Sequence, residues 1–111
     1  MHIAVMDTSG ALRGYLRMTD AQNLSNNIAM AKAYTSSGIA RPTRMLSTFA
    51  FGENGPTAFA FVEGINLFPG GLPIMSGEVH IGGIGVSGAT GDQDEQCAQA
   101  GLDAAKAADL L

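Results

Sequence analysis

Two histidines, His2 and His80, are the only imidazole side chains in this sequence of 111 residues. A metal ion held through an imidazole nitrogen therefore has no other choices. His80 stands between Val79 and Ile81 in a segment that predicts a strand, so its side chain points to the opposite face from theirs. We expect His80 to be either a surface or hydrogen-bonded residue or a ligand. His2, near the chain end, is the poorer candidate unless oligomerisation buries it.

Three acidic residues are candidates for general acid or base catalysis. Asp94 and Glu95 follow Asp92 at the start of a predicted helix, and Glu63 lies in a mixed apolar stretch. A carboxyl group at the mouth of a pocket can accept and return a proton. For the helix residues the alternative is capping and compensation of the helix dipole. For Glu63 it is a position that faces solvent.

Anion binding is the chemistry indicated by Arg41, one of only six basic residues. Its guanidinium group can hold a carboxylate through two parallel hydrogen bonds. In the alternative, Arg41-Pro42-Thr43 only ends one helix and begins the next, because proline disfavours helix at the residue before it and threonine can cap a helix. Thr43 is accordingly either a cap or part of the same binding site.

Glycine-rich segments predict a second kind of binding surface. Pro69-Gly70-Gly71 is either a tight turn between strands or a backbone rim against which a flat ligand can lie, since glycine allows close approach. Ser87 and Gly88 lead into a helix N-terminus, a position that attracts anions. All five residues are therefore candidate ligand-binding positions.

Well-known catalytic motifs are absent from the sequence. It contains no Ser-His-Asp constellation, HExxH metal site, phosphate-binding Walker loop or CxxC pair. The single cysteine, Cys97, excludes an internal disulfide. The glycines between positions 82 and 88 lie mainly within a predicted strand, so they are not a dinucleotide-binding fingerprint.

Composition limits the partners that the chain can have. The net charge is −4 and no run of lysines or arginines occurs. We therefore expect no nucleic-acid partner, because phosphate neutralisation needs a basic surface. No apolar stretch approaches the roughly 20 residues that span a bilayer, and the first residues have no basic signal-peptide region. These features, with the lone cysteine, favour a cytoplasmic protein.

Hydrophobic periodicity predicts one domain over residues 1–111, with the order β-β-α-α-β-β-β-α. Strands are predicted at 3–6, 12–18, 65–68, 72–75 and 78–86, and helices at 25–35, 43–51 and from 92 onward. Consecutive strands joined by short turns must pair antiparallel, since parallel pairs need long crossovers. The sequence therefore predicts an α+β fold in which helices pack on an antiparallel sheet.

The last helix is expected to pack on the longest strand. Asp92 and Glu95 have the spacing of a capping pair at its start. One helix face carries small residues such as Gly101 and Ala104, and the strand has glycines at 82, 83 and 85. Glycine in a strand indicates that another backbone or a ligand packs closely there. We expect that backbone to be the small face of the last helix.

Five short motifs occur in one order over almost the whole chain. They are Ala31-Lys32-Ala33-Tyr34-Thr35, Arg41-Pro42-Thr43, Phe68-Pro69-Gly70-Gly71-Leu72-Pro73-Ile74, Gly82-Gly83-Ile84-Gly85-Val86-Ser87-Gly88-Ala89, and Asp94-Glu95 with the following Ala98 to Leu102. Asp7-Thr8-Ser9-Gly10 with Arg17-Met18 forms a matching opening hairpin. Together these segments resemble the GlcG/HbpS-like family, which includes the C-terminal module of PduO-type proteins.

The resemblance implies a profilin-like fold with an antiparallel five-stranded sheet between helices. It also implies homo-oligomers, which in the family are often dimers built into larger rings or octamers. Several members bind haem, PduO-type modules are linked to corrinoid metabolism, and others have no agreed activity. Haem is thus the implied cofactor, and His80 is the candidate axial ligand of its iron.

The sequence departs from the family at its start. Family members usually begin with a helix before the first strand, whereas this sequence opens on the strand. Some haem-binding members use a histidine from that helix, so their axial-ligand assignment does not transfer. We expect either that the helix is dispensable or that another subunit fills the sheet face it covers.

Two functions follow. The first is a small oligomeric protein that binds haem or a related tetrapyrrole in a cleft at a subunit interface. The second is a cofactor-free isomerase, hydratase or lyase that acts on a small polar metabolite, with Arg41 beside Asp94, Glu95 and Glu63. A third, plainer possibility is a subunit whose role is assembly. The family resemblance favours the first.

Overall fold

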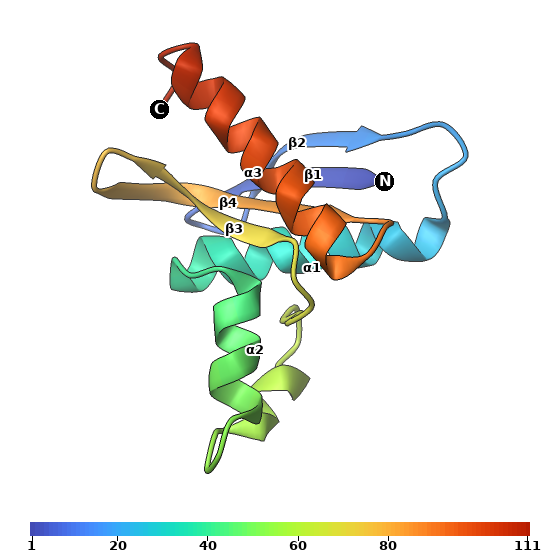
Figure 1. The fold of residues 1–111 in the computed structure, drawn as a ribbon, viewed down its shortest axis with the longest axis vertical. Coiled ribbons are helices and arrows are strands. Elements are labelled where there is room, and N and C mark those ends of the chain that lie inside the picture. The colour runs from blue at the N-terminus through green and yellow to red at the C-terminus, as the bar shows by residue number, and fades with distance from the viewer.

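A four-stranded antiparallel sheet forms the centre of the structure, with a long helix on each face (Figure 1). The computed structural model describes residues 1–111. The strands are β1 (His2–Asp7), β2 (Leu12–Arg17), β3 (Gly71–Ser76) and β4 (Val79–Ser87), in the order β2-β1-β4-β3. The helices are α1 (Asn23–Ile39), α2 (Thr43–Phe51) and α3 (Gly91–Ala107), with a 3₁₀ helix η1 (Thr57–Phe61). The predicted α+β class and antiparallel pairing are confirmed.

Helix α1 packs on the glycine face of the sheet. A Cβ atom at Gly85 would lie 2.1 Å from the Ala29 carbonyl oxygen, and one at Gly83 would lie 2.4 Å from the Ser37 nitrogen. Only glycine at these two strand positions leaves room for the helix backbone. The expected close approach of a helix backbone to the glycines of β4 is therefore present. The helix that approaches is α1, so the expectation that it is α3 is wrong.

Helix α3 instead covers the apolar face of the same strands. Ile84 and Val86 of β4 join Leu72, Ile74 and Ala98 in the main core cluster. Side chains alternate between the two faces of a strand, so β4 turns Gly83 and Gly85 to α1 and Ile84 and Val86 to α3. The two helices are thus held by different means: α1 by backbone proximity and α3 by apolar burial.

The sheet has four strands, so the expectation of a fifth at 65–68 is wrong. That segment is a loop that packs Leu67 against Leu46 and Ala50 of α2. Side chains satisfy its backbone: Asn66 N–H donates to the Thr35 hydroxyl at 3.0 Å, and Phe68 N–H donates to the Asn66 side chain at 3.0 Å. Such local side-chain hydrogen bonds replace those of a strand ladder.

The helix starts also differ from the expected caps. Helix α1 begins after Gln22 rather than at Ser25, and α2 begins after Pro42, so Thr43 is inside the helix. Helix α3 has a capping box formed by Thr90 and Gln93, not by Asp92 and Glu95. The observed capping box lies two residues before the expected one.

Helix α2 and η1 project away from the sheet as a separate arm (Figure 1). A small cluster of Leu46, Ala50 and Leu67 holds the arm together. Its outer surface exposes Met45, Phe49, Phe51 and Phe61. No helix of the structure combines the length and apolar character needed to cross a membrane.

The glycine contact with α1 can be tested by Gly85→Ala. The added Cβ meets backbone on α1 at 2.1 Å, so we expect a loss of about 3 kcal/mol or more in unfolding free energy, because an overpacked helix must move off the sheet. Denaturant unfolding measures it. Gly38→Ala is the matched control: nothing lies within 4 Å of its Cβ position, and alanine in a helix should be neutral or slightly stabilising. Equal stability of the Gly85→Ala variant would contradict this packing.

The turn after β1 makes the stability of the fold depend on pH. Hydrogen bonds from the Ser9 hydroxyl at 2.5 Å and the Ser9 N–H at 2.9 Å lower the pKa of Asp7 to about 2. Because this pKa lies below the unfolded value, the charged form stabilises the fold above about pH 4, and that contribution disappears as the pH falls towards 2.

We expect Asp7→Asn to lose less stability than the parent chain between pH 4 and pH 2. Denaturant unfolding across that range measures the difference. Glu53→Gln, in a turn without such hydrogen bonds, is the control and should behave like the parent. Parallel curves for Asp7→Asn and the parent would show that Asp7 makes no such contribution.

Candidate functional site

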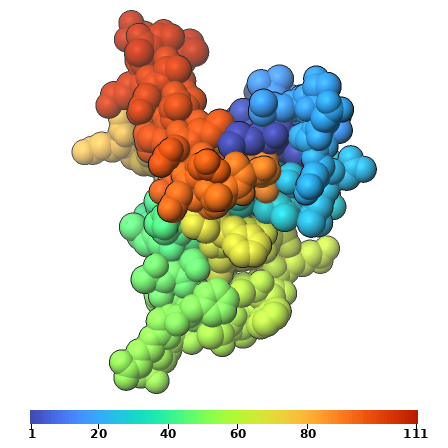
Figure 2. Space-filling model, turned by 45° about the vertical axis from the view of Figure 1, so that its right-hand side comes forward, coloured from blue at the N-terminus to red at the C-terminus, as the bar shows by residue number.

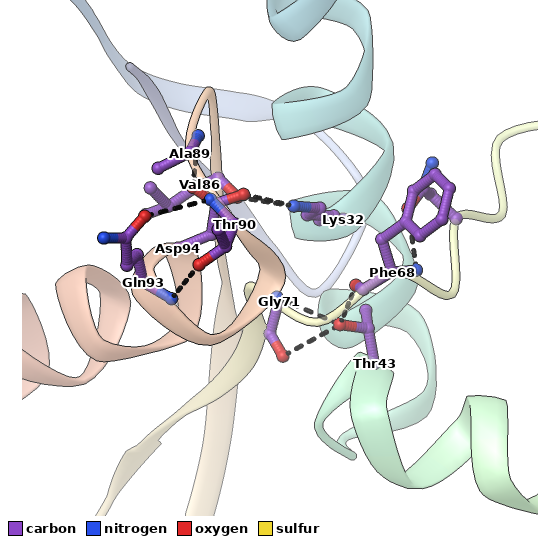
Figure 3. Close-up of polar contacts among 10 residues, drawn as sticks. Lys32, Thr43, Phe68, Gly71, Val86, Ala89, Thr90, Gln93 and Asp94 are labelled. Atoms are coloured by element: carbon purple, nitrogen blue, oxygen red, sulfur yellow. Dashed lines mark hydrogen bonds and ion pairs between the residues drawn. The ribbon is translucent and has the colours of Figure 1, made fainter.

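A fully buried ion pair joins α1 to α3 behind the end of β4 (Figure 3). Lys32 Nζ donates to Asp94 Oδ2 at 3.1 Å and to the Val86 carbonyl oxygen at 2.8 Å. The side chains of Lys32 and Asp94 are 2% and 3% exposed. The other carboxylate oxygen of Asp94 accepts the Ala89 N–H at 3.0 Å. The pair therefore ties together α1, β4, the following loop and α3.

Gly70 lies directly against this pair. A Cβ atom there would be 2.8 Å from Lys32 Nζ, 3.0 Å from Asp94 Cβ and 2.5 Å from the Val86 oxygen. The φ angle of Gly70 is +130°, in a region that side chains rarely adopt. Position 70 therefore requires glycine for both reasons.

Thr43 holds the backbone on either side of the Pro69–Gly70 turn (Figure 3). Its buried hydroxyl donates to the Phe68 carbonyl oxygen at 2.7 Å and accepts the Gly71 N–H at 3.0 Å. Thr43 neither caps α2 nor lines a pocket, so its contacts position the rim rather than touch a ligand.

A pocket of about 400 Å³ opens beside the ion pair. Its polar lining includes Lys32, Asp94, Gln22 and the hydroxyl-bearing Ser25 and Ser87. Its apolar lining includes Ile28, Phe68 and Pro69, and Gly88, Ala89 and Gly91 complete the wall. Figure 2 shows the yellow segment before β3 directly below the orange start of α3 and beside the cyan start of α1, the three parts that meet here. The pocket has an apolar side and a polar floor.

The electrostatics of the floor are set by burial. Loss of solvent lowers the pKa of Lys32 below its usual value, and the hydrogen bond and charge of Asp94 act in the opposite direction. A lysine whose charged form is penalised in this way releases its proton more readily than an exposed one. A perturbed ionisable pair in a cleft is a feature shared by many functional sites.

Four of the expected site residues line this pocket: Pro69, Ser87, Gly88 and Asp94. Gly70, Gly71 and Thr43 lie immediately behind its rim. The structure therefore brings together the two glycine-rich segments, which lie far apart in the sequence. Their roles in binding remain predictions.

Other expected site residues lie elsewhere. Arg41 is exposed and its guanidinium donates to the Ala40 carbonyl oxygen at 2.9 Å. Glu63 is exposed after η1. Glu95 pairs at 3.1 Å with Arg44 of α2, which also contacts Asp92, and these hydrogen bonds raise the pKa of Arg44. Of the three candidate acids, only Asp94 lines the pocket.

Neither histidine reaches the pocket. His2 is buried, with Nδ1 hydrogen-bonded to the Tyr15 hydroxyl and Nε2 to the Gln22 carbonyl oxygen at 2.8 Å. His80 lies seven positions before Ser87 on β4, roughly 20 Å away along the strand. Its Nε2 is buried without a hydrogen-bond partner. The structure thus separates the candidate axial ligand from the glycine rim.

Lys32 is the central residue that sequence reasoning missed. In the sequence it stands between Ala31 and Ala33 in a helical motif, and that position alone indicates no functional role. A usable signal existed: Lys32 shares a helix face with Ala29 and Ser36, three and four residues away, and that face is buried. A lysine on the buried stripe of a helix requires a partner.

Two larger pockets lie on the surface, but neither contains a buried ionisable group. One of about 510 Å³ lies between β3 and α3, and one of about 650 Å³ lies between α2 and α3 around the Arg44–Glu95 pair. Their ionisable residues are exposed or half-buried, whereas only the pocket at Lys32 has a buried charge pair in its floor. We therefore take the pocket at Lys32 as the candidate site.

The fold and this site define a small α+β domain of a known family. The family model described as haem degrading protein HbpS-like matches residues 1–103. The chain therefore belongs to the HbpS-like family. A Citrobacter freundii relative, described as an uncharacterized 15.0 kDa protein in the dhaT–dhaS intergenic region, is 32% identical over 90% of this chain and 72% of its own length.

Solved structures of similar proteins agree. The Klebsiella pneumoniae protein ORFY superposes with a TM-score of 0.87 at 30% identity, covering 92% of this chain and 72% of that one. HbpS superposes at 0.83 and 32% identity, with 93% and 72% coverage. A PduOC–haem complex superposes at 0.81 and 27% identity, with 93% and 76% coverage. Family membership and a haem-bound neighbour support a small haem-binding protein.

Proposed function

We propose that this chain binds haem or a related tetrapyrrole with one edge of the macrocycle in the pocket beside Lys32. The observation that carries the proposal is the position of Phe68, which is 65% exposed at the pocket wall next to Pro69. A flat aromatic ligand gains dispersion and stacking energy against such a surface. The haem complex of a structural neighbour supports the same ligand class.

The two sides of the pocket suit different parts of a tetrapyrrole. Phe68, Pro69 and Ile28 offer contacts to the ring face, while Ser25 and Ser87 offer hydroxyl groups to polar substituents at its edge. Neither hydroxyl takes part in the side-chain hydrogen bonds of the chain, so both are available to a ligand. This is the pattern of a mostly apolar site with a few polar groups that set orientation.

The residues present fit the ring but not the iron. Within the pocket the lining contains no imidazole, thiolate or thioether, the side chains that usually bind haem iron. His2 has both nitrogens engaged, and His80 lies at the other end of β4. Recognition through this pocket therefore depends on the macrocycle and its substituents rather than on an axial bond from the lining.

The size of the pocket supports a site shared between subunits. At about 400 Å³ it lies near the lower end of the roughly 300–1,000 Å³ typical of ligand pockets. A macrocycle would therefore extend past Phe68 onto the open surface, where a second copy of the chain would cover it. Homo-oligomerisation is part of the proposal. So is a cytoplasmic setting, which the single free cysteine supports.

A cofactor-free enzyme acting on a small polar metabolite is the second candidate function. It is favoured by the buried Lys32–Asp94 pair, which places a proton donor and a carboxylate in the pocket floor. Arg41, Glu95 and Glu63 lie outside this pocket, so the enzyme would depend on Asp94 and Lys32 instead of those three residues.

Titration with hemin and with metal-free protoporphyrin IX tests the main proposal. We expect hemin to give a sharpened, shifted Soret band, and the two ligands to bind with dissociation constants within about threefold, because the pocket supplies no iron ligand. Phe68→Ala should weaken both by about tenfold, corresponding to about 1.4 kcal/mol of lost ring contact. The broad absorbance of free hemin with the parent chain would rule the proposal out.

Two variants serve as controls for that titration. Phe61→Ala removes an aromatic side chain of η1 that is 86% exposed and lies outside the pocket, and it should leave binding unchanged. His80→Ala should also leave it unchanged. A large loss of hemin affinity in His80→Ala, with protoporphyrin binding intact, would instead establish His80 as the axial ligand and place the iron elsewhere.

A further inference from the structure

Lys32 is placed for chemistry that ligand binding alone does not require. It is one of only two lysines in the chain, its side chain is 2% exposed, and it lines the pocket. Burying an ion pair is seldom stabilising in comparison with apolar side chains of similar volume. A buried lysine at a pocket therefore calls for an explanation in terms of its amine.

The hydrogen bonds of Lys32 leave one direction of its amine unused. Nζ carries three hydrogens when charged, and the protein accepts two of them, through the Val86 carbonyl and Asp94. Once Asp94 has taken a proton, rotation about the Cε–Nζ bond brings the lone pair of the neutral amine to the remaining tetrahedral position. Gly70 packs closely against Nζ, since a Cβ there would come within 2.8 Å, and the amine still lines the pocket.

Charge argues against a simple anion site at this lysine. The positive charge of Lys32 is already balanced by Asp94 at 3.1 Å. An incoming anion would meet no net positive charge from these groups. A neutral electrophile meets no such cost, and the pocket volume of about 400 Å³ suits a small molecule.

We propose that Lys32 is a nucleophilic amine that forms an imine with a small aldehyde or ketone, with Asp94 moving the proton. Asp94 accepts a proton from the ammonium group, and the neutral amine attacks the carbonyl carbon to form a carbinolamine. Asp94 then returns that proton to the carbinolamine hydroxyl, which leaves as water while the C=N bond forms. The iminium product carries the positive charge that Lys32 had and keeps Asp94 as its counter-ion.

Several features around Lys32 favour this step. Burial lowers the pKa of Lys32, which raises the neutral fraction of the amine at a given pH. Ser25 and Ser87 line the same pocket and can hold polar groups of the carbonyl compound. Phe68 and Pro69 shield the site on one side. The proposal does not depend on tetrapyrrole binding, which the hemin titration tests separately.

Reductive trapping tests the proposal on the intact chain. The purified protein is incubated at pH 7 with propanal, a neutral aldehyde, and sodium cyanoborohydride, and the alkylated peptides are quantified by mass spectrometry. Lys106, exposed near the end of α3, is the internal control. We expect Lys32 to be alkylated at least about tenfold faster than Lys106, because Asp94 is in place to move the proton at Lys32. Lys106 labelled as fast as Lys32, or faster, would overturn the proposal.

Two further measurements separate reactivity from simple accessibility. In denaturant both lysines should react at the same rate, because the selectivity comes from the fold. Asp94→Asn should slow trapping at Lys32 by about tenfold or more without changing Lys106, since the amide cannot move the proton. Circular dichroism checks that this variant is folded. Undiminished trapping at Lys32 in the folded variant would overturn the role of Asp94.

Discussion

The contact between Lys32 and Asp94 is the interaction on which the rest of the structure depends. It is made between residues 62 positions apart and brings together α1, the end of β4 and the start of α3. An unpaired charge at this depth would cost several kcal/mol, so the three segments must meet correctly for either group to be buried. The same contact forms the floor of the pocket, so fold and site share one constraint.

Glycine makes that contact geometrically possible. Gly83 and Gly85 let α1 approach the sheet closely enough for Lys32 to reach Val86 and Asp94. Gly70 then lets the turn before β3 close over the pair. On the opposite face, Ile84 and Val86 supply the apolar burial that holds α3. One strand thus provides close backbone packing on one side and a hydrophobic core on the other.

Much of the fold could be predicted from the sequence, because local patterns determine it. Strand alternation, the hairpin turns and the proline at the start of α2 predict the α+β class and all four observed strands. The expected fifth strand does not form, because the side chains of Thr35 and Asn66 accept the hydrogen bonds of the loop backbone. The site was harder: Arg41 and Glu63 have suitable chemistry but face solvent, and the partner of Lys32 is defined only by tertiary structure.

A double-mutant cycle on Lys32 and Asp94 tests this account most directly. Unfolding free energies are measured for the parent chain, Lys32→Met, Asp94→Asn and the double variant. Each single change should cost about 3 kcal/mol, because it leaves a buried charge or its partner unsatisfied. The double variant should be less destabilised than the sum by about 2 kcal/mol or more. Additivity within about 0.5 kcal/mol would show that the two residues act independently and would contradict the account.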